Sequence, residues 1–265
     1  RQSTPGMKSS GWEKHTMSAR SFAGVVMVLE WVCVGMLASV SPLGGAEIKD
    51  TESAAHGSEA AQYQVKETYQ FPGFKIIQLE LGVLSHYSYL LVSGREALVV
   101  DPGRDTALYI DAARKEGATI AGVYLTHSHA DFVAGHAELA QAAPIYVNAK
   151  TGAQFKHQAV REGDTLPIGD AVLKILETPG HTPDGTCALV AGKQNPDKPL
   201  AIFTGDTLFI GSVGRPDLLG EGMAASTLAS MMFDTWNEKL SKLPDDVLVL
   251  PAHGAGSLCG AKLSD

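Results

Sequence analysis

Short apolar runs alternate with polar, glycine-bearing segments along the chain from residue 74 onward. Runs of this kind, rich in Val, Ile, Leu and Tyr, are typical of β-strands. Longer segments with apolar residues at helical spacing predict helices over 105–116, 133–143 and 223–243, the first with Asp105 as its N-cap. Because strands and helices alternate without strict regularity, the predicted fold class is α/β or α+β, with sheet predominating. The predicted strands cover residues 74–79, 88–92, 97–101, 121–125, 145–148, 171–177, 186–190, 200–204 and 247–250.

The first 46 residues follow a different pattern. A polar segment with scattered positive charge precedes a mostly apolar stretch at 21–40, and small residues at 41–46 precede a polar run that starts at Glu47. This order is the layout of an export signal. Glu30 interrupts the apolar stretch and makes a permanent membrane span costly. The alternatives to a cleaved signal are an uncleaved anchor and a misassigned upstream start.

The pattern therefore predicts three regions. Residues 1–46 are expected to be a signal peptide or a membrane anchor, residues 47–68 a polar linker, and residues 69–265 a folded domain. Such a layout predicts an exported, periplasmic protein, with an anchored or a cytoplasmic form as the alternatives.

Composition narrows the range of partners. The net charge is −8 and the chain has no basic stripe, which argues against nucleic acid as a partner. Cys33, Cys187 and Cys259 have no paired metal-binding spacing, and we expect the last two to be free thiols. The expected oligomeric state is a monomer or a homodimer.

Three histidines and one aspartate fall within residues 127–136, directly after an apolar run. His127 and His129 are two positions apart, so in an extended segment they point to the same side. Asp131 lies where the helix predicted over 133–143 would begin. Converging imidazoles with a nearby carboxylate are the ligands that a borderline divalent metal prefers. His136 lies outside this spacing, and we interpret it as a solvated or capping residue.

Three later motifs each place a ligand type at the end of a predicted strand, beside a glycine. They are a Gly-His step at His181, a Gly-Asp step at Asp206 and a His-Gly step at His253. Taken singly, each is explained by turn chemistry. Together with the first histidine stretch, all at the same end of predicted strands, they indicate a metal site.

In this order the motifs resemble those of the metallo-β-lactamase superfamily: Thr-His-x-His-x-Asp, then Gly-His, then Gly-Asp, then a late His. The resemblance covers about residues 74–260. It implies a four-layer αββα sandwich, with the site at one edge between the two sheets.

One position departs from the dinuclear members of that superfamily. They carry a His directly after the Asp, where this chain has Phe132. A second metal would keep Asp131 and His253 with a share of Asp206, but it would lack a neutral nitrogen ligand, so a bridging hydroxide is harder to assemble. Two His and one carboxylate around a single metal are instead the arrangement that leaves positions open for O₂ at Fe(II).

The residues around the motifs, over 129–139, 203–218 and 253–260, look like the persulfide dioxygenase branch, closest to members with a downstream rhodanese domain. This likeness implies one Fe(II) held by His127, His181 and Asp206. It also implies oxidation of a thiol persulfide, such as glutathione persulfide, by O₂ to sulfite and thiol. The chain contains no rhodanese sequence and ends soon after the late His, so we expect a C-terminally shortened domain and a rhodanese supplied in trans.

The resemblance also assigns roles to the remaining residues. His129 and Asp131 would be catalytic, hydrogen-bonding metal-bound water and orienting the ligands. Phe132 would present an apolar wall near the sulfur. Arg215 would lie near the substrate, where its guanidinium can fork onto a carboxylate, with a loop ion pair to Asp217 as the alternative. For His253 three roles stay open: a hydrogen-bond donor to the ligands, a weak ligand of a second metal, or a structural turn residue.

Two other functions fit the same motifs. The first is a zinc hydrolase of the glyoxalase II kind, in which Zn(II)-bound hydroxide cleaves a thioester, because metal identity does not follow from ligand types alone. The second is a non-catalytic, export-targeted domain.

Overall fold

The computed structural model describes residues 63–254, 257 and 259, which belong to one compact unit. The expected signal or anchor at residues 1–46 lies outside the described residues. Within the described part of the chain, no helix is long and apolar enough to cross a membrane.

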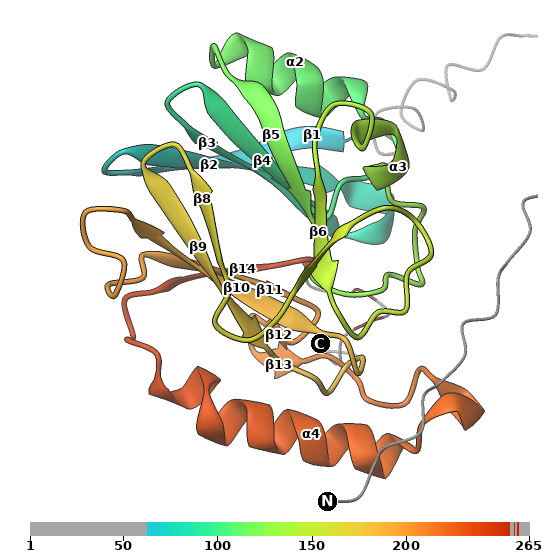
Figure 1. Ribbon diagram of the computed structural model, residues 1–265. Helices are drawn as coiled ribbons and strands as arrows, with labels where there is room; N and C mark the ends of the chain where they lie inside the picture. The colour runs from blue at the N-terminus through green and yellow to red at the C-terminus, as the bar shows by residue number, and fades with distance from the viewer. Residues whose placement is uncertain (1–62, 255–256, 258, 260–265) are drawn as a thin grey trace, which may run out of the picture. The chain divides into compact units, whose positions relative to one another are not determined.

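Two facing sheets and their covering helices form the domain (Figure 1). The first sheet has seven strands in chain order: β1 (Tyr63–Phe71), β2 (Phe74–Leu81), β3 (His86–Ser93), β4 (Glu96–Val100), β5 (Thr119–Tyr124), β6 (Ile145–Asn148) and β7 (Gln158–Val160). The second has five strands in the order β14 (Leu248–Pro251), β11 (Ala201–Gly205), β10 (Thr186–Gly192), β9 (Ala171–Glu177) and β8 (Thr165–Ile168). β12 (Leu208–Phe209) and β13 (Ser212–Val213) form a small hairpin.

Helices cover the outer faces of both sheets. α2 (Ala107–Lys115) lies on the first sheet and α4 (Ala225–Glu238) on the second, as Figure 1 shows. The shorter elements are α3 (His136–Leu139) and the 3₁₀ turns η1 (Gly82–Leu84), η2 (Gly220–Gly222) and η3 (Leu240–Lys242). The order helix, sheet, sheet, helix is the predicted four-layer αββα sandwich.

The alternation of side chains along each strand builds the layers. In β2, Phe74 and Ile76 belong to the core between the two sheets, whereas Ile77 and Leu79 belong to the core beneath α2. Successive residues of a strand point to opposite faces, so a strand buried on both sides is apolar at nearly every position. This explains why the central strands read as continuous apolar runs in the sequence.

The ends of several strands meet at one edge of the sandwich. The segments that follow β5, β9, β11 and β14 carry the four predicted metal motifs. Two backbone contacts join the sheets at this edge: an antiparallel bridge between His86 and His253, and a hydrogen bond of 2.8 Å from the Thr186 amide to the Thr126 carbonyl. The fold therefore brings together motifs that lie far apart in the sequence.

Three expectations about secondary structure are wrong. Residues 47–62 of the predicted linker over 47–68 lie outside the described residues, but residues 63–68 belong to β1 and not to a linker. β1 lies at the edge of its sheet and most of its residues are exposed, so its composition is polar like that of a linker. The predicted helix over 133–143 is reduced to the single turn α3, since the Gly135 amide bonds the Pro102 carbonyl (2.9 Å) instead of a helical partner. Asp105 is not the N-cap, because α2 begins at Ala107 after Thr106.

Candidate metal centre

Three predicted ligands converge at the shared edge of the sheets. His127, His181 and Asp206 are buried, and their ligand atoms all lie within 4.8 Å of one another. Asp206 Oδ2 is 3.8 Å from His127 Nε2 and 3.5 Å from His181 Nε2. Ligands bound at about 2.0–2.2 Å to one ion lie about 3–4 Å apart, so these separations suit a common metal. We refer to these three residues as the ligand group.

The Asp206 carboxylate has one oxygen in use and one oxygen free. Oδ1 accepts a hydrogen bond from His253 Nδ1 at 2.8 Å. Oδ2 is buried and has no hydrogen-bond partner among the described residues. A buried, unsatisfied carboxylate oxygen is costly. A cation held between this oxygen and the two imidazoles removes that cost, so the residues present fit a divalent metal.

The other ring nitrogen of each ligand histidine has its own partner. His181 Nδ1 donates to the Arg215 carbonyl at 2.9 Å. The Thr126 hydroxyl donates to Asp101 Oδ2 at 2.8 Å, which leaves its oxygen to accept from His127 Nδ1 at 3.0 Å. Both hydrogen-bond networks place the ring proton on Nδ1 and the free lone pair on Nε2. The two Nε2 atoms therefore face Asp206 ready to bind a metal.

Asp101 holds the first histidine motif in place through buried hydrogen bonds. It is fully buried at a positive φ of 48°, and it accepts hydrogen bonds from the Thr126 amide (2.8 Å) and from His129 Nε2 (2.9 Å). Burial alone would raise the pKa of Asp101, but His129 and Thr126 outweigh it and hold the pKa below its ordinary value. Burial would likewise lower the pKa of His129, but Asp101 outweighs it and raises the pKa. His129 thus points its Nε2 at Asp101 and not at the ligand group.

A second set of ligand types lies on the other side of Asp206. The ligand atoms of Asp131, His253 and Cys259 are also within 4.8 Å of one another, and we call this set the closed group. His253 donates to Asp206 Oδ1 and, through Nε2, to Asp131 Oδ2, both at 2.8 Å. Burial opposes the charged ring, but the two carboxylates outweigh it and raise the pKa of His253 to about 9. His253 is therefore an imidazolium that bridges two carboxylates at neutral pH.

Phe132 lies against histidine rings instead of supplying a ligand. Its ring centroid is 4.0 Å from that of His86 and 4.5 Å from that of His129. His86 is fully buried, and its Nδ1 is 2.6 Å from the Tyr63 hydroxyl. Burial, followed by the neighbouring His129 and His253, lowers the pKa of His86 to about 3, which keeps this ring neutral. Phe132, His127 and His129 line a cavity of about 320 Å³, which we call the metal-side cavity.

Two other residues singled out from the sequence lie outside both groups. The Arg215 guanidinium forms a two-point ion pair with Asp217, with both N–O distances at 2.7 Å. Its backbone carbonyl, not its side chain, reaches His181. His136 begins α3, and its ring packs against Phe155 at 4.6 Å. The role of Arg215 in substrate binding stays a prediction.

Several residues of the centre have no sequence signal of their own. Asp101 and His86 act through partners that only the folded chain supplies. Cys259 follows the late His by a few residues and, together with Cys187, is a free thiol as predicted. Its approach to Asp131 was not predicted, because single cysteines without paired spacing carry no metal signal.

Comparison with known proteins places these features in context. Residues 81–253 match the family model described as the metallo-beta-lactamase superfamily. A hydroxyacylglutathione hydrolase from Polaromonas is 33% identical over 175 residues, which cover 63% of this chain and 62% of that protein.

Solved structures agree in fold. A metallo-beta-lactamase from Staphylococcus aureus is similar with a TM-score of 0.64 and 35% identity, over 72% of this chain and 59% of that one. ETHE1 from Myxococcus xanthus is similar with a TM-score of 0.60 and 29% identity, over 70% of this chain and 78% of that one. The chain thus spans less than two thirds of the Polaromonas and Staphylococcus proteins.

Proposed function

The chain belongs to the metallo-beta-lactamase superfamily, and we propose that it is a mononuclear iron enzyme that oxidises a thiol persulfide with O₂ to sulfite and thiol. The substrate class is a low-molecular-mass persulfide such as glutathione persulfide. We further propose that the protein is exported and that any rhodanese activity is supplied by a partner.

The observation that carries the proposal is the contrast around Asp206. One oxygen is free and faces the Nε2 atoms of His127 and His181, whereas the other is bonded to a His253 imidazolium. A protonated imidazole has no lone pair to give to a metal. Phe132 adds no nitrogen on that side. This arrangement supports a single three-ligand metal with open positions, the arrangement that suits Fe(II) and O₂.

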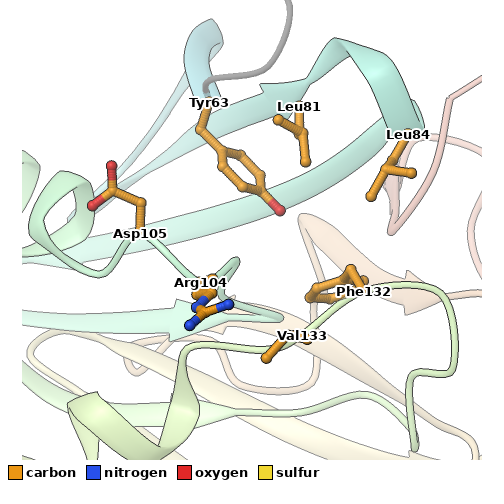
Figure 2. Close-up of a pocket in the computed structure, with 7 residues that line it drawn as sticks. All are labelled: Tyr63, Leu81, Leu84, Arg104, Asp105, Phe132 and Val133. Carbon is orange, nitrogen blue, oxygen red and sulfur yellow. The ribbon is translucent and has the colours of Figure 1, made fainter. Parts of the chain in front are cut away.

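The residues of the chain then have distinct tasks. His127, His181 and Asp206 would hold the iron, which when bound supplies the redox chemistry with O₂. Asp101 and Thr126 keep His127 in the tautomer that binds metal. Figure 2 shows Phe132 at the edge of a neighbouring cavity. Its ring, beside His127 and His129, is also an apolar part of the wall of the metal-side cavity, where the persulfide sulfur would lie.

His253 holds a proton at Nε2 against Asp131, at the rim of the site. Asp131 is partly exposed, with a side-chain exposure of 25%, so this hydrogen-bonded pair connects the buried Asp206 to solvent. The pair can pass a proton to a group that approaches the centre from outside.

The second candidate is a zinc hydrolase that cleaves a thioester. It is favoured by the similarity to a hydroxyacylglutathione hydrolase and by the closed group, where Asp131, His253 and Cys259 would offer a second ion three ligand atoms. Such an ion would first have to displace the proton from His253 Nε2, which makes binding there strongly dependent on pH.

The deciding experiment measures metal and O₂ together. We expect protein from iron-supplemented cells to contain about one iron per chain and to consume O₂ when given glutathione persulfide. His181→Ala should lose both properties. His157→Ala, a histidine outside both groups whose Nδ1 bonds the Phe155 carbonyl, is the matched control and should keep both. Two zinc ions per chain and thioester cleavage without O₂ uptake would establish the hydrolase instead.

A further inference from the structure

A cavity of about 350 Å³ lies next to the metal-side cavity, and Phe132 lines both. Its walls are aliphatic and aromatic side chains together with two charged residues, Arg104 and Asp105 (Figure 2). Cavities of this size and character suit a small organic group held mostly by apolar contacts, with a few polar groups to orient it.

Contacts with residues outside the cavity hold its walls in place. The Tyr63 hydroxyl is 2.6 Å from His86 Nδ1, and the Phe132 ring packs on the same His86 ring. The loop that carries Arg104 is clamped as well, because the Gly103 amide donates to the Tyr109 hydroxyl at 2.8 Å. A Cβ at Gly103 would overlap the Tyr63 ring, so only glycine permits this close approach. A cavity preset in this way binds a ligand without a large ordering cost.

Arg104 supplies a cation to the wall of this cavity. Among the described residues its guanidinium takes part in no hydrogen bond or ion pair, unlike that of Arg215, which is paired with Asp217. Figure 2 shows the carboxylate of Asp105 pointing away from Phe132 and Val133. An unpaired guanidinium beside an apolar cavity recognises a carboxylate, which it can bind through two parallel hydrogen bonds.

We propose that this cavity binds the apolar, carboxylate-bearing arm of the thiol that carries the persulfide, with Arg104 on the carboxylate. The proposal rests on the proposed function. Because Phe132 lines both cavities, the arm would lie in this cavity while the sulfur enters the metal-side cavity. The occupant is thus a small thiol with an acidic end, and neutral thiols of equal length bind less well.

The experiment uses two thioethers that bind without being oxidised as persulfides: the S-methyl derivatives of mercaptohexanoic acid and of mercaptohexanol. Calorimetric titration of the iron-loaded protein gives each dissociation constant. We expect the acid to bind about tenfold more tightly than the alcohol, because a hydrogen bond to a charged group contributes more than one to a neutral group. Arg104→Gln should abolish this preference and leave alcohol binding unchanged.

Two further variants separate this role from a general loss of structure. Arg95→Gln, the same change at an exposed turn arginine remote from the cavity lining, should keep the tenfold preference. Leu84→Ser alters the apolar wall and should weaken both thioethers by a similar factor. An undiminished preference in Arg104→Gln overturns the proposal, as does an equal loss in Arg95→Gln.

The same titrations distinguish failure of the cavity from failure of the proposed function. If binding depends on Arg104 but the persulfide of mercaptohexanoic acid supports no O₂ uptake, the cavity assignment is supported and the dioxygenase is rejected. If O₂ uptake occurs and its KM is the same in wild type and Arg104→Gln, the dioxygenase is supported and the cavity assignment is rejected.

Discussion

The two sides of Asp206 carry nearly the same residue types but differ in their hydrogen bonds. On the side of the ligand group, the Nε2 atoms of two histidines face a free carboxylate oxygen. On the side of the closed group, a charged histidine is bonded to both Asp206 and Asp131. A histidine becomes a metal ligand or a salt-bridge partner according to what its second ring nitrogen contacts. Backbone and hydroxyl oxygens leave a lone pair free, whereas two carboxylates draw a second proton onto the ring.

The largest expected effect separates the two groups by their metal content. Asp206→Asn removes the only anionic ligand, and we expect at least a tenfold loss of bound iron by elemental analysis. Asp131→Asn removes only a partner of His253, and we expect iron close to the wild-type amount. If both variants lost iron equally, the closed group would be part of the metal site and the contrast would be wrong.

The next largest effect concerns Asp101, whose hydrogen bonds hold the histidine motif of the ligand group in place. Breaking a buried, charged hydrogen-bond network costs about 3–5 kcal/mol, so we expect Asp101→Asn to lower the free energy of unfolding of the metal-free protein by about that amount at neutral pH. Denaturant titration measures this change. Asp111→Asn, which breaks an exposed pair with Arg114, should cost less than about 1 kcal/mol.

The decrease in the free energy of unfolding caused by Asp101→Asn should also depend on pH. The pKa of Asp101 is lowered by folding from its ordinary value of 3.8, so its ionised form stabilises the protein above that value. This stabilisation is lost as the pH falls through the lower folded pKa. The difference between wild type and Asp101→Asn should therefore shrink in acid, and a difference that grew would contradict the assigned network.

A smaller effect is expected when the closed group gains a further ligand and becomes able to bind a second metal. Phe132→His restores a nitrogen beside Asp131, and we expect the zinc content of zinc-grown protein to rise from about one toward two ions per chain. Phe132→Leu keeps the position apolar and should stay near one ion. Equal metal content in the two variants would mean that Phe132 does not limit the second site.

The smallest effect tests Arg215. Its pair with Asp217 is exposed to solvent, which screens the attraction, so Asp217→Asn should barely change the free energy of unfolding. Freeing the guanidinium should lower the KM for glutathione persulfide about twofold, with kcat unchanged, and Arg215→Gln should raise it. Identical KM values in all three proteins would exclude a role for Arg215 in substrate binding.

The strands that form the two-sided core were predictable from sequence, because burial on both faces makes them apolar at nearly every position. Of the edge strands of the two sheets, β14 was predicted, but β1, β7 and β8 were not. β1 is mostly exposed, and β7 and β8 are short, so neither hydrophobic pattern nor length sets them apart from loops. The helix expected over 133–143 failed because a tertiary contact of Gly135 took the place of helical hydrogen bonds.

The ligand group was predictable because each member lies in a local motif at a strand end, and the geometry brings together the three residues expected to hold the metal. The state of His253 was not predictable, since it depends on two carboxylates from distant segments. The same holds for Asp101, whose tie to His129 spans 28 positions, and for His86, which depends on Tyr63. These residues act through partners that no local pattern records.

The bridge between His86 and His253 also has a kinetic consequence. It lies beside a hydrogen bond from the Tyr89 hydroxyl to the Pro251 carbonyl, which joins residues 162 positions apart. Contacts of such long range form late, because the intervening chain must first close a large loop. The final strand β14 therefore docks near the end of folding, and Asp206 acquires its imidazolium partner only then. Burst-phase experiments should find strand structure in the first sheet before the closed group exists.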